Sequence, residues 1–216
     1  MALSKVDFNN INVTPAASKA LKWNSSANGF ETGDLVGNMV LLSTATASSS
    51  ATIDFTSNID STYKEYQFHF TDIHPASASD FTFQVDTGTN TNYNITMTTT
   101  TVQAFHTEDD SSSGVSYKTS QDQGQGTAFQ NLTINGLANA NDGSTSGMLT
   151  LFDPSNTTFI KHFIVNSNHM NSGGTPNQQH NIIAGYFNTT TALTRVRFKM
   201  ASGNIDAGTI KMYGIL

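Results

Sequence analysis

Six histidines are the side chains of this sequence that most readily suggest chemistry at a metal ion. They are His69, His74, His106, His162, His169 and His180. A zinc site requires several ligands held together, and no pair here shows the HExxH arrangement or an i, i+2 spacing with a third ligand nearby. Ligands can converge from distant strands, but this spacing favours structural roles. We expect neither a metal ion nor another cofactor.

Glu108, Asp109 and Asp110 form the densest acidic group and could take part in the hydrolysis of a glycan. Such hydrolysis requires two carboxylates on a rigid frame across a cleft. Three consecutive acids before Ser-Ser-Ser-Gly provide no such frame, so we interpret the protein as not an enzyme. A glycan depolymerase that uses Glu108 or Asp109 with Asp142 is the catalytic alternative. A Ca²⁺ site is a further alternative, because carboxylate and carbonyl oxygens suit that ion.

Other signatures of catalysis and of nucleotide binding are missing from the sequence. Cysteine is absent, which excludes disulfides, thiolate zinc sites and cysteine nucleophiles. No GxSxG or Walker motif occurs, and GQG at 124–126 lacks the lysine and helix of a phosphate loop. Ten Lys and Arg against sixteen Asp and Glu give a net charge of −6, which disfavours nucleic-acid binding. No window approaches the roughly 18 apolar residues of a membrane span, so we expect no membrane insertion.

Three basic side chains form a ladder on one predicted strand. Arg195, Arg197 and Lys199 alternate with apolar residues and therefore share one face. The ladder is either a partner surface or a set of like charges that protects a sheet edge.

Polar loops and tyrosines are further candidates for binding. The segments 135–147 and 167–180 are rich in Ser, Asn and Gly, which is typical of loops between strands. Their candidate ligand-binding side chains are Asn141, Asp142, His169 and His180. Sugars commonly stack on exposed aromatic rings. The open aromatic candidates are Tyr63, Tyr117 and Tyr186.

The elements that must position these residues are short strands. From residue 35 onward, apolar or alternating runs are separated by Ser, Thr, Asn, Asp and Gly. In EYQFHFT, Tyr66, Phe68 and Phe70 fall on one face and polar residues on the other. The runs at 81–85 and 93–97 repeat this alternation, and we expect the three runs to pair in sequence. Further strands are predicted at 35–42, 51–55, 102–106, 128–134, 148–152, 158–165, 182–187, 193–200 and 209–213.

The number and spacing of these runs predict an all-β fold. Residues 35–216 are expected to form one antiparallel β-sandwich that is jelly-roll-like. Residues 1–34 are expected to form an N-terminal arm, in which AASKALKW makes about two helical turns. Leu21, Trp23 and Phe30 are the expected anchors of this arm in assembly contacts.

Four stretches carry a resemblance to a known group of proteins. They are KEYQFHFTDIHPA, VDTGTNTNYNITMTTT, DPSNTTFIKHF and FKMASGNIDAGTIKMYGIL. Their succession resembles virion structural proteins of tailed bacteriophages, particularly those of marine and cyanobacterial phages. The resemblance extends from about Thr46 to Leu216, and the closing stretch is its most specific part. It implies a non-enzymatic component of the virion, either on the capsid exterior or in the tail-fibre apparatus.

Composition agrees with an exposed particle component. Only 12% of the residues are charged, and a cysteine-free, hydroxyl-rich β fold suits a protein exposed outside the cell. We expect a homotrimer, bound to other virion proteins such as major capsid or tail proteins, that acts as capsid decoration, cement or a knob-like piece. The alternative is a tail-fibre module for host attachment, which recognises surface glycans through the loops 135–147 and 167–180.

Overall fold

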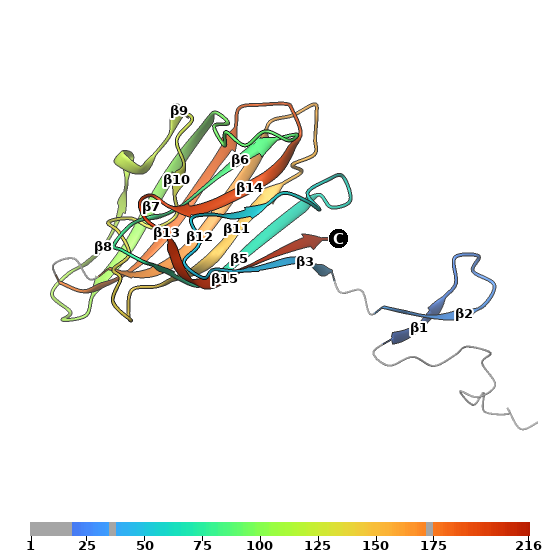
Figure 1. Cartoon of the computed structure of the whole chain (residues 1–216), viewed down its shortest axis with the longest axis horizontal. Coiled ribbons are helices and arrows are strands. Elements are labelled where there is room, and N and C mark those ends of the chain that lie inside the picture. The colour runs from blue at the N-terminus through green and yellow to red at the C-terminus, as the bar shows by residue number, and fades with distance from the viewer. Residues whose placement is uncertain (1–18, 35–37, 172–174) are drawn as a thin grey trace, which may run out of the picture. The chain divides into compact units, whose positions relative to one another are not determined.

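The chain comprises two compact units. A computed structural model describes residues 19–34, 38–171 and 175–216 (Figure 1). The first unit contains residues 1–38 and the second contains residues 39–216. The division therefore falls after Asn38 and not after residue 34.

The described part of the first unit is a β-hairpin. Strand β1 (Lys19–Trp23) pairs antiparallel with β2 (Phe30–Asp34), and Trp23 lies opposite Phe30. The predicted helix is therefore wrong over residues 19–23, and its start at 16–18 lies outside the described residues. An isolated helix of about two turns is too short to be stable in water, whereas the hairpin stacks two aromatic rings across its strands.

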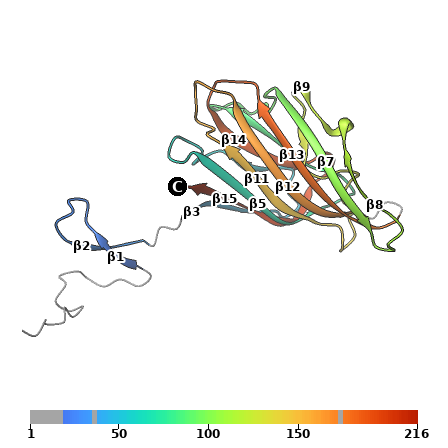
Figure 2. The same cartoon turned by 180° about the vertical axis from the view of Figure 1, so that it is seen from behind.

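The second unit contains a large antiparallel sheet of nine strands. In spatial order, eight of its strands are β3 (Met39–Thr46), β15 (Ile205–Ile215), β5 (Glu65–Pro75), β11 (Thr145–Phe152), β12 (Lys161–Asn171), β13 (Asn177–Phe187), β7 (Met97–Thr107) and β8 (Ser113–Tyr117). The ninth, β9 (Gly124–Gly126), also pairs with β7. The long central strands lie side by side in the view from behind (Figure 2).

A smaller antiparallel sheet covers part of the large one. Its strands, in spatial order, are β10 (Gln130–Asn131), β6 (Phe81–Thr87), β14 (Leu193–Met200) and β4 (Ile53–Phe55). Phe70 of β5 contacts Phe81 of β6 with ring centroids 5.4 Å apart. Phe83 of β6 meets Phe163 of β12 at 5.1 Å, and all four rings are at most 1% exposed. Burial of each such side chain stabilises the fold by roughly 1.5–3 kcal/mol. The predicted antiparallel β-sandwich is thus confirmed, while its jelly-roll character stays a prediction.

The expected pairing of the first three runs is wrong. Strand β5 pairs with β15 and β11, whereas β6 pairs with β14 and β10 in the other sheet. The run 93–97 is not a strand, and β7 begins only at Met97. The carboxylate of Asp86 accepts a hydrogen bond from the backbone N–H of Tyr93 at 2.8 Å, and Tyr93 has a φ of 47°. This bond directs the backbone away from the ladder that alternation alone predicts.

The predicted loop at 167–179 is also wrong, because most of it belongs to two paired strands. Strand β12 continues to Asn171 and β13 begins at Asn177, while residues 172–174 lie outside the described chain. Polar residues occupy the inward face of these strands, so the sequence has the composition of a loop. Ser167, His169 and Asn181 are each at most 1% exposed.

Candidate functional site

The histidines are dispersed over the sandwich. Among the described residues, no group of three or more His, Cys, Asp or Glu side chains could hold a metal ion. His69 lies against the ring of Tyr213, with centroids 4.9 Å apart. His106 lies 3.2 Å from the carboxylate of Asp110, four residues further along the chain. His69 and His106 thus each contact a neighbouring side chain of the sandwich.

The acidic run lies in the turn between β7 and β8. The carboxylate of Asp109 accepts hydrogen bonds from the backbone N–H and hydroxyl of Ser111, which lower its pKa. Asp142 lies in the loop before β11, and two strands separate β11 from β7. Strands β11 and β7 are therefore three spacings of about 4.8 Å, or roughly 14 Å, apart. The carboxyl groups of a glycosidase are about 5–10 Å apart, so the loops begin farther apart than that chemistry requires.

The four loop candidates do not form one site. Asn141 and Asp142 are exposed in the loop before β11. His169 and His180 belong to strands and point to opposite faces, because Asn168 and not His169 lies opposite His180. His180 hydrogen-bonds the side chain of Asn166 on the outer face. The interpretation of His169 and His180 as loop ligands is therefore wrong.

His169 belongs to a buried polar layer beneath residues 130–137, which we term the covering segment. Its Nε2 lies 3.0 Å from the carbonyl oxygen of Ile134 and donates to it, while Nδ1 accepts from the amide of Asn181 at 3.3 Å. Asn181 and Ser167 also donate to the carbonyl of Leu132. Burial lowers the pKa of His169. The layer binds the chain's own backbone and leaves His169 neutral.

Asp80 fixes the other side of the covering segment. One carboxylate oxygen accepts a hydrogen bond from the backbone N–H of Gly136 at 2.8 Å, and the other accepts from the amide of Asn131 at 3.2 Å. Burial raises the pKa of Asp80. The covering segment is thus held by side chains of the large sheet and by Asp80, which immediately precedes β6.

Each cation of the basic ladder has a partner within the chain. Arg197 forms two hydrogen bonds with the carboxylate of Asp54, at 2.7 and 2.6 Å, and lies 4.0 Å above the ring of Tyr93. Arg195 donates to a backbone carbonyl, and Lys199 lies over an aromatic ring. Strand β14 lies between β6 and β4 in the small sheet, so the ladder does not protect an edge.

The three predicted arm anchors lie on the N-terminal hairpin. The rings of Trp23 and Phe30 stack with centroids 4.4 Å apart, and the two side chains are 61% and 42% exposed. Leu21 is 40% exposed on the neighbouring pair of the same hairpin. The hairpin therefore presents an aromatic surface that its own two strands do not cover.

An open groove of about 370 Å³ lies on the outer face of the large sheet, over β11, β12, β13 and β7. Phe152, His162 and Tyr186 contribute rings to it, and Ile164 contributes an aliphatic side chain that is 48% exposed. The rings of His162 and Tyr186 lie on directly paired residues, with centroids 6.2 Å apart. Gly185 of β13 lies between β12 and β7. Its lack of a side chain lets β7 approach closely, because a Cβ there would lie 2.7 Å from the carbonyl oxygen of Thr98.

Thr98 and Tyr186 form one rim of this groove and belong to a network of amides and hydroxyls. The side-chain amide of Gln125 donates to the hydroxyls of Thr98 at 2.7 Å and Tyr186 at 3.3 Å. The amide of Asn188 donates in turn to the side-chain oxygen of Gln125 at 2.6 Å. Gln125 has a φ of 56°, a left-handed conformation that is uncommon for residues other than glycine. These contacts hold the rim in one arrangement.

The other tyrosine candidates have different surroundings. Tyr63 packs edge-on against Tyr66, with ring centroids 5.8 Å apart, and is partly buried. Tyr117 is 54% exposed on β8, at an edge of the large sheet. A second, more polar groove contains His69, Tyr213 and Lys211. Only Tyr186 of the three sequence candidates lines the groove described above.

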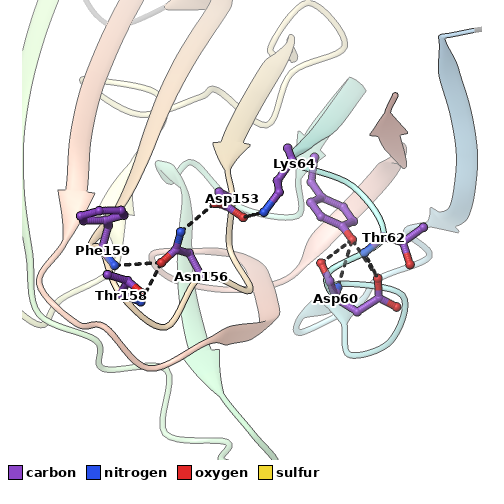
Figure 3. Close-up of polar contacts among 8 residues, drawn as sticks. Asp60, Thr62, Lys64, Asp153, Asn156, Thr158 and Phe159 are labelled. Atoms are coloured by element: carbon purple, nitrogen blue, oxygen red, sulfur yellow. Dashed lines mark hydrogen bonds and ion pairs between the residues drawn. The ribbon is translucent and has the colours of Figure 1, made fainter.

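The loop between β11 and β12 presents one exposed aromatic ring (Figure 3). The side-chain oxygen of Asn156 accepts hydrogen bonds from the backbone N–H groups of Thr158 and Phe159, at 2.7 and 2.8 Å. Asp153 accepts from the amide of Asn156 and pairs with Lys64, and these contacts lower the pKa of Asp153. Phe159 is 69% exposed on this fixed turn.

The groove brings together residues that sequence reasoning did not connect. Its side chains come from strands that are distant in the sequence, and only the register of β12, β13 and β7 aligns them. The sequence predicted strands at 148–152, 158–165 and 182–187 but gave no neighbours across strands. Within the described chain, no helix is both long and apolar enough to cross a membrane. No family model, curated protein or solved structure matches the chain.

Proposed function

We propose that the protein is a non-enzymatic structural component of a bacteriophage virion exterior that associates with further copies of itself. The exposed stack of Trp23 and Phe30 on the hairpin of the first unit carries the association, and the virion role rests on the resemblance of the stretches between Thr46 and Leu216. An isolated two-stranded hairpin is only marginally stable in water. A neighbouring subunit or another virion protein that covers these rings stabilises the hairpin and gains apolar contact area.

The edges of the large sheet support the same proposal. Strand β3 forms one edge, where Met39 and Leu41 are 44% and 52% exposed. Strand β8 lies at the other end, where Val115 is 75% exposed. Exposed edge strands with apolar side chains are templates for contact with another chain. A stable interface buries about 1,200–2,000 Å² of total surface, so we expect contacts beyond the hairpin alone.

Sedimentation velocity of the full chain tests self-association. We expect a species of three chains at micromolar concentration, and dissociation when Trp23 and Phe30 are both replaced by Ala. Tyr63→Ala is the matched aromatic control in the sandwich and should leave the mass unchanged. A monomeric wild-type chain, or a trimer indifferent to the double substitution, contradicts the assembly role of the hairpin.

Immunogold labelling of intact phage particles tests the location. We expect label on the exterior of particles whose genome encodes this chain, either over the capsid or at the tail. Absence of the protein from purified particles would contradict the virion assignment, even if the trimer forms in solution.

A further inference from the structure

The outer-face groove has the chemical character of a small-ligand site. Its volume of about 370 Å³ lies within the roughly 300–1,000 Å³ that such sites occupy. Its floor consists of rings and an aliphatic side chain, and one rim consists of amides and hydroxyls. Ligand sites combine these two features, since apolar contact supplies affinity and a few placed polar groups supply orientation.

The rim can donate hydrogen bonds to a ligand. The hydroxyl oxygens of Thr98 and Tyr186 both accept from the amide of Gln125, so each hydroxyl keeps its own hydrogen for another acceptor. The amide hydrogens of Gln125 are both used by these contacts, which fixes the two hydroxyls next to each other. A ligand that offers several hydroxyl oxygens satisfies such a rim.

The floor selects a ligand with a flat apolar face. The rings of Tyr186, His162 and Phe152 all line the groove. Aromatic side chains with a polar tip bind ligands that are apolar on one side and wet on the other. A sugar ring has this character, because its C–H groups form an apolar face and its hydroxyls project around the rim.

Charge and sheet topology disfavour other ligands. None of the described residues that line the groove is Asp, Glu, Lys or Arg, and the chain carries a net charge of −6. An anionic ligand therefore gains no ion pair in this groove and is repelled by the protein as a whole. Strands β12 and β13 each have a neighbour on both sides, so a peptide cannot add to them as a further strand.

From these features we propose that the groove binds a neutral carbohydrate, with a sugar ring stacked on Tyr186 and His162 and its hydroxyls bonded to Thr98 and Tyr186. The site is separate from the hairpin on which the assembly role rests, because all of the described residues that line it belong to the second unit. It also differs from the loops 135–147 and 167–180, to which sequence reasoning assigned glycan recognition.

A glycan array with the full chain tests this proposal. The probes are oligosaccharides of glucose, galactose, mannose and N-acetylglucosamine, with sialylated and uronic-acid oligosaccharides as acidic members. We expect binding to neutral members, followed by titration calorimetry with the best of them. Tyr186→Ala should weaken that binding about tenfold or more, and Tyr186→Phe should weaken it less because the ring remains.

Tyr213→Ala is the matched control, because Tyr213 also lies beside a histidine on the outer face but in the groove that contains Lys211. The affinity of the Tyr213→Ala variant for the glycan should equal that of the wild type. If Tyr186→Ala fails to fold, as judged by circular dichroism, Tyr186→Phe and Gln125→Ala test the same contacts. Binding to acidic members alone, no binding to any member, or equal losses for Tyr186 and Tyr213 variants would each overturn the proposal. So would an oligomer that dissociates in Tyr186→Ala without any glycan binding.

Discussion

The pH dependence of stability should depend on His169. Burial lowers its pKa in the folded chain, and its Nδ1 faces the donating amide of Asn181. In the unfolded chain the imidazole has an ordinary pKa of about 6.5. Below that pH the unfolded chain takes up a proton that the folded chain excludes. The stability present at higher pH is therefore lost as the pH falls from about 6.5 through the folded pKa.

One proton sets the magnitude of this effect. Its uptake changes the free energy of unfolding by at most about 1.4 kcal/mol per pH unit. Replacing His169 by Gln should remove this slope. It should also lower stability at neutral pH by about 1–3 kcal/mol, because the buried amide of Asn181 loses the acceptor that Nδ1 provides.

Urea unfolding between about pH 7.5 and 5, followed by far-ultraviolet circular dichroism, measures this slope. Fluorescence is unsuitable, because the single Trp lies in the N-terminal hairpin and does not report on the sandwich. His162→Gln is the control, since His162 is exposed on the opposite face of β12. Partial burial also lowers the pKa of His69, so the wild-type profile contains more than one proton and only the difference between variants is decisive. A His169→Gln variant that keeps the full wild-type slope would refute the reasoning.

Three further predictions concern the packing of the sandwich. Arg197→Lys should lower the free energy of unfolding by about 1–2 kcal/mol, because lysine cannot reproduce the paired hydrogen bonds of the guanidinium with the carboxylate of Asp54. Arg195→Lys should lower it by less in the same urea titration, because Arg195 donates to a backbone carbonyl. Phe163→Ala should lower the free energy of unfolding by about 3–5 kcal/mol, whereas Phe159→Ala should leave it almost unchanged, because the two side chains are 1% and 69% exposed. Equal midpoints of the two variants in thermal unfolding would contradict this. Gly208→Ala should lower the yield of folded protein, because Gly208 has a φ of 116° and an added Cβ would lie 2.7 Å from backbone atoms.

Alternation predicted the apolar half of the fold. Leu193–Met200 is a strand as expected, and Val196 and Phe198 on its inward face are fully buried. The inward positions Tyr66, Phe68 and Phe70 of β5 are likewise buried. In a paired strand, apolar side chains that recur every second residue are all buried in one register, so local sequence was sufficient for β5 and β14, whereas the same alternation failed at 93–97.

Partners across strands could not be predicted in the same way. The sequence does not indicate that Asp86 binds the backbone at Tyr93, or that the covering segment supplies carbonyl groups to Ser167 and His169. The first contact joins residues seven apart in a connection that alternation does not describe, and the second joins residues 35 apart that only the assembled sheets bring together. A polar strand whose inward face is satisfied by another segment has the same composition as a loop, and only the tertiary structure distinguishes the two.

The inward and outward side chains of the central strands have different roles, the first in folding and the second in binding. On β12 and β13, the inward residues bind the covering segment or the phenylalanine core, while the outward residues form the groove. Ile164 and Ile182 are 48% and 47% exposed on that outer face, so packing within the chain does not account for their apolar side chains. Because alternate residues face opposite sides of the sheet, an outward substitution leaves the inward contacts intact. Substitutions on the outer face should therefore change binding with little effect on stability, and those at His169 should do the reverse.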